Sequence, residues 1–350
     1  MDLSALLQLT IDKKASDLHL LPSYFPTVRV SGELFQLTTL EKLTSDGLEK
    51  MLIPILNPEQ KELLLANREL DLAFKLKTAR FRVNLYYAQN ALCGSFRYIQ
   101  ARISTLEELG LPGILHQCTD LRQGLVLLTG PTGEGKSTTL ASLVNEINQK
   151  YAKHIITIED PIEYVYPKYK SIISQRELHQ DTHSWTVALK SALREDPDVV
   201  LVGEMRDFET ISLALTAAET GHLVFSTLHT NSAPESIDRI IDTFPPHQQN
   251  QIRNQLAIVL KMVITQRLIP KQNSVDRIPA VEILFNNSAV SNSIREGKTY
   301  LIANILETSE EDGSMLFEKN LLTLYRSGII TKETAFSYAI RPKEIGRFIK

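Results

Sequence analysis

Two rhythms of apolar and polar residues divide the chain. From residue 124 onward, short apolar runs alternate with segments of helical spacing. The runs read GLVLLTG, HIITIED, DVVLVGE and HLVFST, and the segments between them cover 137–149, 184–194 and 208–220. Strands that are apolar on both faces and alternate with helices are typical of a mostly parallel sheet covered on both sides. We therefore predict an α/β domain over 124–350.

The end of this domain has mostly helical spacing. Such spacing covers 247–268, 288–296, 314–326 and 331–339, whereas IPAVEILF predicts one more strand. Residues 1–100 have a period of two in SDLHLLP, TVRVSGELFQL, ELDLAFKL, RFRVNLYYA and CGSFRYI, with helical spacing at 41–54 and 58–67. This favours a small α+β domain with a curved sheet and a helical face. A linker over 101–123 joins the two domains.

Composition narrows the class of protein. The 350 residues include 43% hydrophobic and 23% charged residues, with a formal net charge of -3. These values fit a globular protein and argue against direct nucleic-acid binding. Cys93 and Cys118 have no metal-ligand spacing and suit a reducing cytoplasm. No stretch approaches the roughly 20 apolar residues of a membrane span, so we expect contact with a membrane only through partners.

One segment carries a strong signal for phosphate binding. GPTGEGKS follows a predicted strand, precedes a predicted helix and fits G-x-x-x-x-G-K-[ST]. Backbone N–H groups and the helix N-terminus would surround the phosphate oxygens. Lys136 would reach the β and γ phosphates of ATP, and Ser137 would hold Mg²⁺. The candidate nucleotide-binding residues are Gly130, Pro131, Thr132, Gly133, Glu134, Gly135, Lys136, Ser137 and Thr138.

Glu134 is unusual because it places a carboxylate inside an anion-binding loop. We expect its side chain to point to solvent, so that its backbone alone takes part in binding. A modest loss of electrostatic attraction for phosphate would result.

Acidic residues follow two of the apolar runs. Glu204 ends DVVLVGE and is the candidate that polarises the attacking water, the alternative being a helix-capping acid. Glu159, Asp160 and Glu163 follow HIITI around a proline, at the edge where ligands bind in such sheets. Three carboxylates near a phosphate make sense with Mg²⁺, for which Glu159 and Asp160 join Ser137 as candidate ligands. The alternative is a solvated acidic loop.

Histidines and arginines supply further candidates. His222 and His229 flank the HLVFST strand and could sense the γ-phosphate; a structural role is the alternative, and their placement at opposite ends disfavours a metal site. Arg82 and Arg97 lie in strand-like runs of the first domain. They could act as arginine fingers towards a neighbouring subunit or pair with surface acids.

Taken together, these segments resemble one family. GPTGEGKSTT, ITIEDPIEY, LREDPDVVLVGEMRD and AAETGHLVFSTLHTN are similar to the Walker A, Asp box, Walker B and His box of the bacterial secretion and type IV pilus ATPase superfamily. ASDLHL, RFRVN, DRIIDTFPPHQQ and SIREGK resemble its PilT-type retraction branch. The resemblance covers essentially the whole chain. It implies a PAS-like N-terminal domain joined flexibly to a RecA-like P-loop ATPase domain.

The resemblance also implies an assembly and residue roles. It implies a homohexamer with ATP between subunits, working at the cytoplasmic face of the inner membrane with the inner-membrane pilus platform protein and the pilus machinery. Glu204 would be the catalytic acid and Glu163 would position the water. His222 and His229 would couple nucleotide state to domain movement, and Arg82 and Arg97 would cross to a neighbour's nucleotide.

Departures from the family pattern leave alternatives open. Serine is usual where Glu134 stands, and AVSNSIREGK replaces a segment close to AIRNLIREGK that is associated with retraction. The start near SDLHL and the lack of a four-cysteine insertion after VITQRLIP favour retraction over assembly. An accessory pilus motor, a DNA-uptake pseudopilus ATPase or a secretion ATPase remains the alternative. A regulatory nucleotide-binding protein and a helicase are less favoured.

Overall fold

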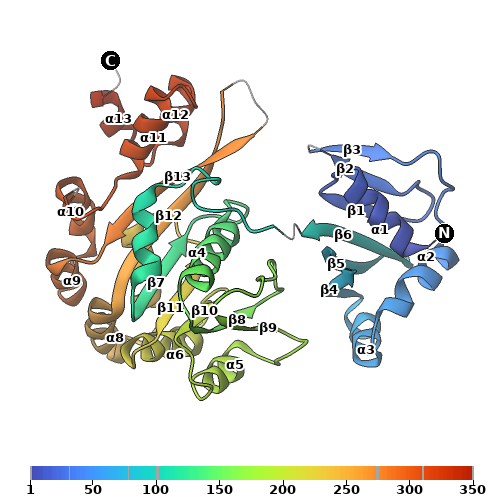
Figure 1. Ribbon diagram of the computed structural model, residues 1–350, viewed down its shortest axis with the longest axis horizontal. Helices are drawn as coiled ribbons and strands as arrows, with labels where there is room; N and C mark the ends of the chain where they lie inside the picture. Colours follow the sequence, from blue (N-terminus) through green and yellow to red (C-terminus); the bar gives the residue numbers. More distant parts are fainter. Residues whose placement is uncertain are drawn as a thin grey trace. The chain divides into compact units, whose positions relative to one another are not determined.

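The computed structural model describes residues 2–30, 32–77, 79–99, 102–272, 276–309 and 311–348 (Figure 1). Contacts divide the chain into two compact units. The N-terminal unit comprises Met1–Arg102 and Pro161–Val165, and the C-terminal unit comprises Ile103–Asp160 and Tyr166–Lys350. Residues 100 and 101, where the linker was predicted to begin, lie outside the described residues, and the predicted domain limits stay predictions.

The N-terminal unit is built on a six-stranded antiparallel sheet. Its order is β3-β2-β1-β6-β5-β4. The strands are β1 (Asp17–Leu20), β2 (Thr27–Val30), β3 (Glu33–Gln36), β4 (Glu69–Leu76), β5 (Ala79–Ala88) and β6 (Ala91–Ile99), and the helical elements are α1 (Leu3–Asp12), α2 (Ser45–Leu52), η1 (Ile53–Ile55) and α3 (Pro58–Asn67).

The helices of this unit form where the sequence caps them and gives them an apolar face. α3 begins with a capping box between Asn57 and Gln60 and is followed by its C-cap Arg68, whose backbone is left-handed. Leu48 of α2 and Leu64 of α3 belong to the same buried cluster as residues of β5 and β6. The helices therefore cover one sheet with a shared core, as an α+β unit requires.

The C-terminal unit contains a seven-stranded sheet of order β13-β12-β7-β11-β10-β8-β9 (Figure 1). All neighbours are parallel except β12 and β13. The strands are β7 (Gly124–Thr129), β8 (His154–Glu159), β9 (Ile172–Glu177), β10 (Val199–Val202), β11 (Leu223–Leu228), β12 (Leu260–Pro270) and β13 (Arg277–Phe285).

Helices cover both faces of this sheet. Leu125 and Leu127 of β7 belong to one buried cluster, and Val126 and Leu128 belong to another, because successive side chains of a strand point to opposite faces. Residues of α4 complete the second cluster, and residues of α5, α6, α7 and α8 complete the first. These helices are α4 (Lys136–Lys150), α5 (Trp185–Ala192), α6 (Phe208–Glu219), α7 (Ala233–Asp242) and α8 (Pro246–Val259), and the 3-10 helix η2 (Gly113–Asp120) precedes β7.

The predicted helix over 247–268 is wrong in its second half. The helix α8 ends at Val259, and β12 begins at Leu260. Met262 and Ile264 face one buried cluster while Val263 faces the other, which is strand periodicity. A short apolar run buried on both faces cannot be distinguished from a helix by its period alone, so the sequence was ambiguous here.

The last part of the chain packs on the β12–β13 hairpin. Ile269, Ile278 and Ala280 of the hairpin share a buried cluster with residues of α11, α12 and α13. The elements are α9 (Ser288–Arg295), η3 (Thr299–Leu301), α10 (Ile302–Thr308), α11 (Phe317–Arg326), α12 (Lys332–Tyr338) and α13 (Pro342–Phe348). Within the described ranges, every helix is too short or too polar to cross a bilayer.

Candidate active site

The phosphate-loop motif lies between β7 and α4, as the sequence predicts. The loop runs from Gly130 to Gly135, and α4 begins at Lys136. Gly130, Gly133 and Gly135 have φ values of 140°, 83° and 79°, which side chains with a Cβ rarely adopt. A Cβ on Gly130 would also lie 2.3 Å from the Gln266 carbonyl oxygen. The glycines let the backbone turn tightly into the N-terminus of α4, where an anion would bind.

Lys136 is held inside the loop. Its side chain is buried, and Nζ donates hydrogen bonds to the carbonyl oxygens of Gly130 at 2.6 Å and Pro131 at 2.8 Å. Ser137 and Thr138 lie in the first turn of α4 and are half-buried. This arrangement concentrates a cation, two hydroxyl groups and a helix N-terminus where phosphate oxygens would bind.

The expectation that Glu134 points to solvent is wrong. Glu134 is half-buried, and its carboxylate accepts a hydrogen bond from the Leu268 N–H on β12. Its own carbonyl oxygen accepts a hydrogen bond from Gln266 Nε2 at 2.7 Å. Sequence reading missed this contact because the partner is a backbone group 134 positions away, and no local pattern signals it.

Glu204 lies just past β10, next to a histidine from the neighbouring strand. Its Oε2 lies 3.4 Å from His229 Nε2, and its Oε1 pairs with Arg206 Nη2 at 2.5 Å. The other ring nitrogen of His229, Nδ1, lies 3.4 Å from Thr132 Oγ1 in the phosphate loop. Because β11 lies between β7 and β10, the residue that follows β11, His229, lies between the phosphate loop and Glu204.

The alternative that Glu204 caps a helix does not fit the geometry. The N-cap of α6 is Asp207, whose carboxylate accepts hydrogen bonds from Thr210 N at 2.8 Å and Thr210 Oγ1 at 3.1 Å. Glu204 therefore has no capping duty on α6. Its side chain is only 15% exposed and faces His229 and Arg206.

The acids after β8 have different surroundings. Glu159 Oε1 accepts hydrogen bonds from Thr157 Oγ1 at 2.7 Å and Gln175 Nε2 at 3.3 Å, whereas Asp160 is exposed. Glu163 belongs to Pro161–Val165, which is part of the N-terminal unit. Among the residues that the structure describes, no three His, Cys, Asp or Glu side chains are arranged to hold a metal ion. The metal-binding role of Glu159 and Asp160 stays a prediction.

The two histidines of β11 are far apart. His222 precedes the strand, where its Nδ1 lies 2.9 Å from the Ala217 carbonyl oxygen and 3.2 Å from Thr220 Oγ1. Seven residue steps of roughly 3.3 Å separate it from His229, or about 23 Å. The structure thus brings His229 to the phosphate loop and leaves His222 at the opposite end of β11.

Arg82 and Arg97 face each other across β5 and β6. Arg97 Nε donates a hydrogen bond to Asp17 Oδ1 at 2.9 Å, and Asp17 is buried. Burial alone would raise the pKa of Asp17, but hydrogen bonds from Ser16 and Arg97 and the charge of Arg97 hold that pKa below its usual value. Arg97 therefore has a structural partner within its own chain, which the sequence left open.

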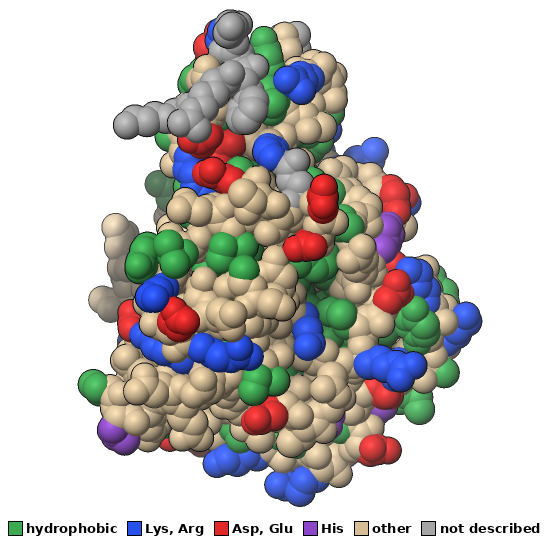
Figure 2. All heavy atoms as spheres, turned by 90° about the vertical axis from the view of Figure 1, so that its left-hand side faces the viewer, with side chains coloured by type: hydrophobic (Ala, Val, Ile, Leu, Met, Phe, Trp, Pro, Cys, Tyr) green, Lys and Arg blue, Asp and Glu red, His purple; other side chains and the backbone are tan. Residues whose placement is uncertain are grey.

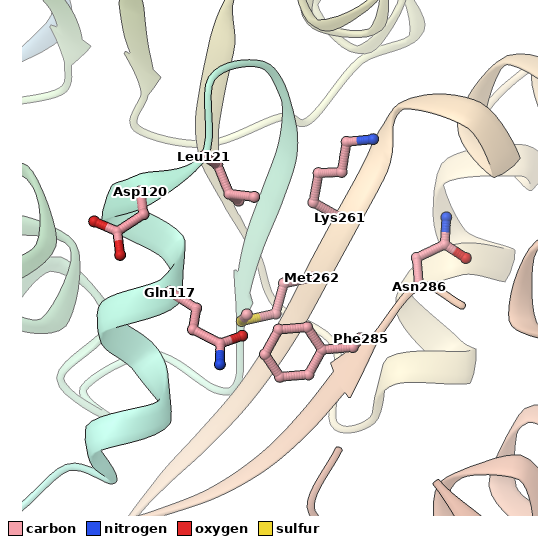
Figure 3. Close-up of a pocket in the computed structure, with 7 residues that line it drawn as sticks. All are labelled: Gln117, Asp120, Leu121, Lys261, Met262, Phe285 and Asn286. Carbon is pink, nitrogen blue, oxygen red and sulfur yellow. The ribbon is translucent and has the colours of Figure 1, made fainter. Parts of the chain in front are cut away.

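A pocket of about 340 Å³ lies elsewhere in the C-terminal unit. Figure 3 shows Gln117 of η2 beside Met262 and Phe285 of the β12–β13 hairpin, and the remaining lining residues are Asp120, Leu121, Lys261 and Asn286. These residues surround the beginnings of β7 and β12, whereas the phosphate loop follows the end of β7. The pocket is therefore separate from the nucleotide site.

Comparison with known proteins agrees with this geometry. Residues 67–342 match the family model described as type II/IV secretion system protein. The chain is 46% identical over 311 residues to a protein of Neisseria gonorrhoeae named twitching motility protein, covering 89% of this chain and 83% of that protein. It is 42% identical over 344 residues to the type IV pilus retractation ATPase PilT of Pseudomonas aeruginosa, covering 98% and 99% of the two chains.

A solved structure extends the likeness to three dimensions. The crystal structure of the pilus retraction motor PilT and bound ADP superposes with a TM-score of 0.92 at 42% identity, covering 99% of each chain. The predicted fold class, an N-terminal domain followed by a RecA-like ATPase domain, is confirmed, and so is the family resemblance. Together with the phosphate loop and Glu204, these findings identify an ATP-hydrolysing enzyme. The chain belongs to the type II/IV secretion system protein family.

Proposed function

We propose that this protein is a motor that hydrolyses ATP to retract type IV pili, and that it works as a homohexamer. The similarity to retraction proteins along nearly the whole chain supports the biological role. One observation carries the chemistry: His229 lies between Thr132 of the phosphate loop and Glu204. That arrangement joins a phosphate-binding group to a candidate base through one side chain.

The phosphate loop would hold the nucleotide. The residues from Gly130 to Thr138 would surround the phosphates with N–H and hydroxyl groups. Lys136 would exchange its hydrogen bonds with the Gly130 and Pro131 carbonyls for bonds to phosphate oxygens. Since the ammonium group is already held inside the loop, little side-chain freedom would be lost when it binds.

The residues around the loop fit Mg²⁺, which prefers oxygen ligands. The Ser137 hydroxyl is the first candidate ligand, and Glu159 and Asp160 at the end of β8 supply carboxylates within the same unit. When bound, Mg²⁺ would neutralise charge on the phosphate oxygens during phosphoryl transfer. Ser137 would orient it from the first turn of α4.

Glu204 would orient and deprotonate the attacking water, and Glu163 would assist in placing it. Arg206 and His229 fix the Glu204 carboxylate from two sides. His229 would report the state of the phosphate loop to this carboxylate through Thr132. His222, at the far end of β11, would act in coupling to domain movement and not in the chemical step.

The hexamer would complete each site with a neighbouring subunit. Arg82 and Arg97 would reach the nucleotide of that neighbour as arginine fingers, which stabilise charge in phosphoryl transfer. Arg82 is the stronger candidate for this role, because Arg97 is already paired with Asp17.

The partners would belong to the pilus machinery. We place the protein in the cytoplasm at the inner-membrane face, where it would push on the pilus platform protein and touch the membrane only through partners. Direct nucleic-acid binding is not part of the proposal. On the face of the C-terminal unit in Figure 2, basic and acidic side chains are interspersed, which is consistent with this view.

Deletion of the gene in the source organism tests the biological role. We expect pili that are still made and displayed but no longer retract. Pilus retraction at the wild-type rate and force in the deletion strain would contradict the proposal. Loss of pilus assembly, of DNA uptake alone or of protein secretion would assign the motor to a different machine.

A further inference from the structure

Glu134 has two attachments outside the phosphate loop, both on β12. Its carboxylate accepts the Leu268 N–H, and its carbonyl oxygen accepts Gln266 Nε2. We infer that Glu134 is a positioning residue that fastens the phosphate loop to β12 and so holds the loop N–H groups ready for nucleotide. This inference rests on ATP hydrolysis in the proposed function and is independent of pilus retraction.

The edge of β12 explains why Leu268 needs such a partner. β12 pairs with β7 only as far as Thr265, which lies opposite Thr129. Beyond Thr265 the open edge of β12 faces the phosphate loop in place of a strand. A half-buried N–H without an acceptor would cost free energy, and a carboxylate supplies a charge-assisted hydrogen bond.

Gln266 provides the second attachment. Its side chain is almost completely buried, and its Oε1 accepts a hydrogen bond from Thr139 Oγ1 at 2.8 Å. One amide therefore joins the Glu134 carbonyl to the first turns of α4. A Cβ on Gly135 would lie 3.0 Å from this amide nitrogen, and a Cβ on Gly130 would lie 2.3 Å from the Gln266 carbonyl oxygen, so both glycines let β12 approach the loop. The loop is thus fastened to β12 at Glu134 and lies close to it at Gly130 and Gly135.

The carboxylate has two opposing effects on nucleotide affinity. Its negative charge repels phosphate, which weakens binding. Its hydrogen bond to Leu268 preorganises the loop, which strengthens binding. Glu134→Gln removes the charge and keeps an oxygen that can accept the N–H. Glu134→Ala removes both. The two substitutions therefore separate charge from positioning.

The test compares steady-state ATP hydrolysis and Mg-ATP binding for the full chain and these two variants. For Glu134→Ala we expect KM and the nucleotide Kd to rise about tenfold, which corresponds to about 1.4 kcal/mol. We expect kcat to fall less than KM rises. Glu134→Gln should bind Mg-ATP as tightly as the wild type or more tightly. Glu307→Ala, which removes an exposed carboxylate of α10, is the control and should leave all constants unchanged.

Amide hydrogen exchange measures directly whether the Leu268 N–H is protected by the Glu134 carboxylate. The segment containing Leu268 should exchange faster in Glu134→Ala and at the wild-type rate in Glu134→Gln. Should Glu134→Ala not fold, Glu134→Asp carries the same test, because it keeps the charge on a side chain one methylene shorter. We expect KM and Kd to rise at least as much as in the alanine variant, because the repelling charge stays and the hydrogen bond to Leu268 is lost.

Two results would overturn the inference. One is an equal change of KM in Glu134→Ala and Glu134→Gln, because the hydrogen-bond acceptor that only Gln keeps would then make no difference to nucleotide binding. The other is unchanged exchange at Leu268 in Glu134→Ala. A wild-type protein without ATP hydrolysis would instead contradict the proposed function, and the exchange measurement would still test the attachment.

Discussion

His229 Nε2 lies 3.4 Å from Glu204 Oε2, at the junction of two neighbouring parallel strands. The same ring reaches Thr132 in the phosphate loop. A change in the loop on nucleotide binding can therefore move the carboxylate through a single rigid imidazole.

Replacing the two β11 histidines separately should separate their roles. We expect His229→Ala to lower kcat for ATP hydrolysis at least about tenfold with little change in KM, because the Glu204 carboxylate loses a fixed neighbour. His222→Ala is the matched control, since His222 contacts Ala217 and Thr220 and lies about 23 Å from His229. Equal loss of kcat in both variants would contradict this division.

Glu204→Gln should abolish hydrolysis while leaving nucleotide binding intact. A general base contributes about 100-fold or more to a rate, and the amide cannot take a proton from water. Binding of a fluorescent ATP analogue should stay within about twofold of the wild type, since Glu204 follows β10 and is not in the loop. Glu209→Gln, in the exposed first turn of α6, is the control. An unchanged kcat in Glu204→Gln would remove this residue from the mechanism.

Arg82 should act across subunits if the ring is completed in trans. In mixed hexamers, Arg82→Ala subunits should lower activity more steeply than their fraction in the mixture. Arg97→Ala is a less clean test, because it also removes a partner of buried Asp17. Asp17 has a lowered pKa, so its stabilising effect is present above its unfolded pKa and lost as pH falls. Activity strictly proportional to the wild-type fraction would argue against the role in trans.

Arg341 should be essential for stability. Its Nη1 lies 3.3 Å from both Glu282 and Glu318, whose side chains are fully buried. Arg341→Ala would leave these acids without their shared cation and should cost about 3–5 kcal/mol in unfolding free energy. Arg326→Ala, on the exposed side of α11, is the control and should change it little.

The same cluster predicts a pH dependence. Burial raises the pKa of Glu282, so the folded state accommodates the protonated carboxyl better than the charged one. The protein therefore loses stability as pH rises above the pKa of a glutamate in the unfolded chain, about 4.3. Arg341 opposes this loss. The deficit of Arg341→Ala, measured by calorimetry, should therefore be larger at pH 8 than at pH 5, and Glu282→Gln should reduce it. A deficit independent of pH would contradict the assignment.

His116 should make stability fall as pH rises above about 6.5. Its ring lies between Glu146 and Glu107, each 2.7 Å from a ring nitrogen, and the hydrogen bond to Glu146 is the main cause of its raised pKa. The stabilisation is complete below the unfolded pKa of about 6.5 and is lost as pH rises through the folded value. Urea unfolding of His116→Gln should lack this slope. His247→Gln, an exposed histidine, should retain it.

Sequence reading succeeded where local chemistry decides the structure. The apolar run before Gly130, the glycine spacing and the following helix place the phosphate loop without any tertiary information. It failed where distant contacts decide. The stretch from Leu260 became a strand because β7 and β13 flank it, and Glu134 turned inward because β12 offers an N–H. Neither partner is visible in the neighbouring sequence.

Two glycines of the loop motif are required for different reasons, as the close approach of Gly130 to Gln266 shows. At Gly130 any Cβ would collide with the β12 backbone, whereas at Gly133 the space around a Cβ is open and only the positive φ disfavours it. In a saturation mutagenesis library screened only for folded protein, substitutions at position 130 should disappear while asparagine or aspartate at position 133 should survive. The first glycine of a nucleotide motif would thus be enforced by the sheet, before any selection for turnover begins.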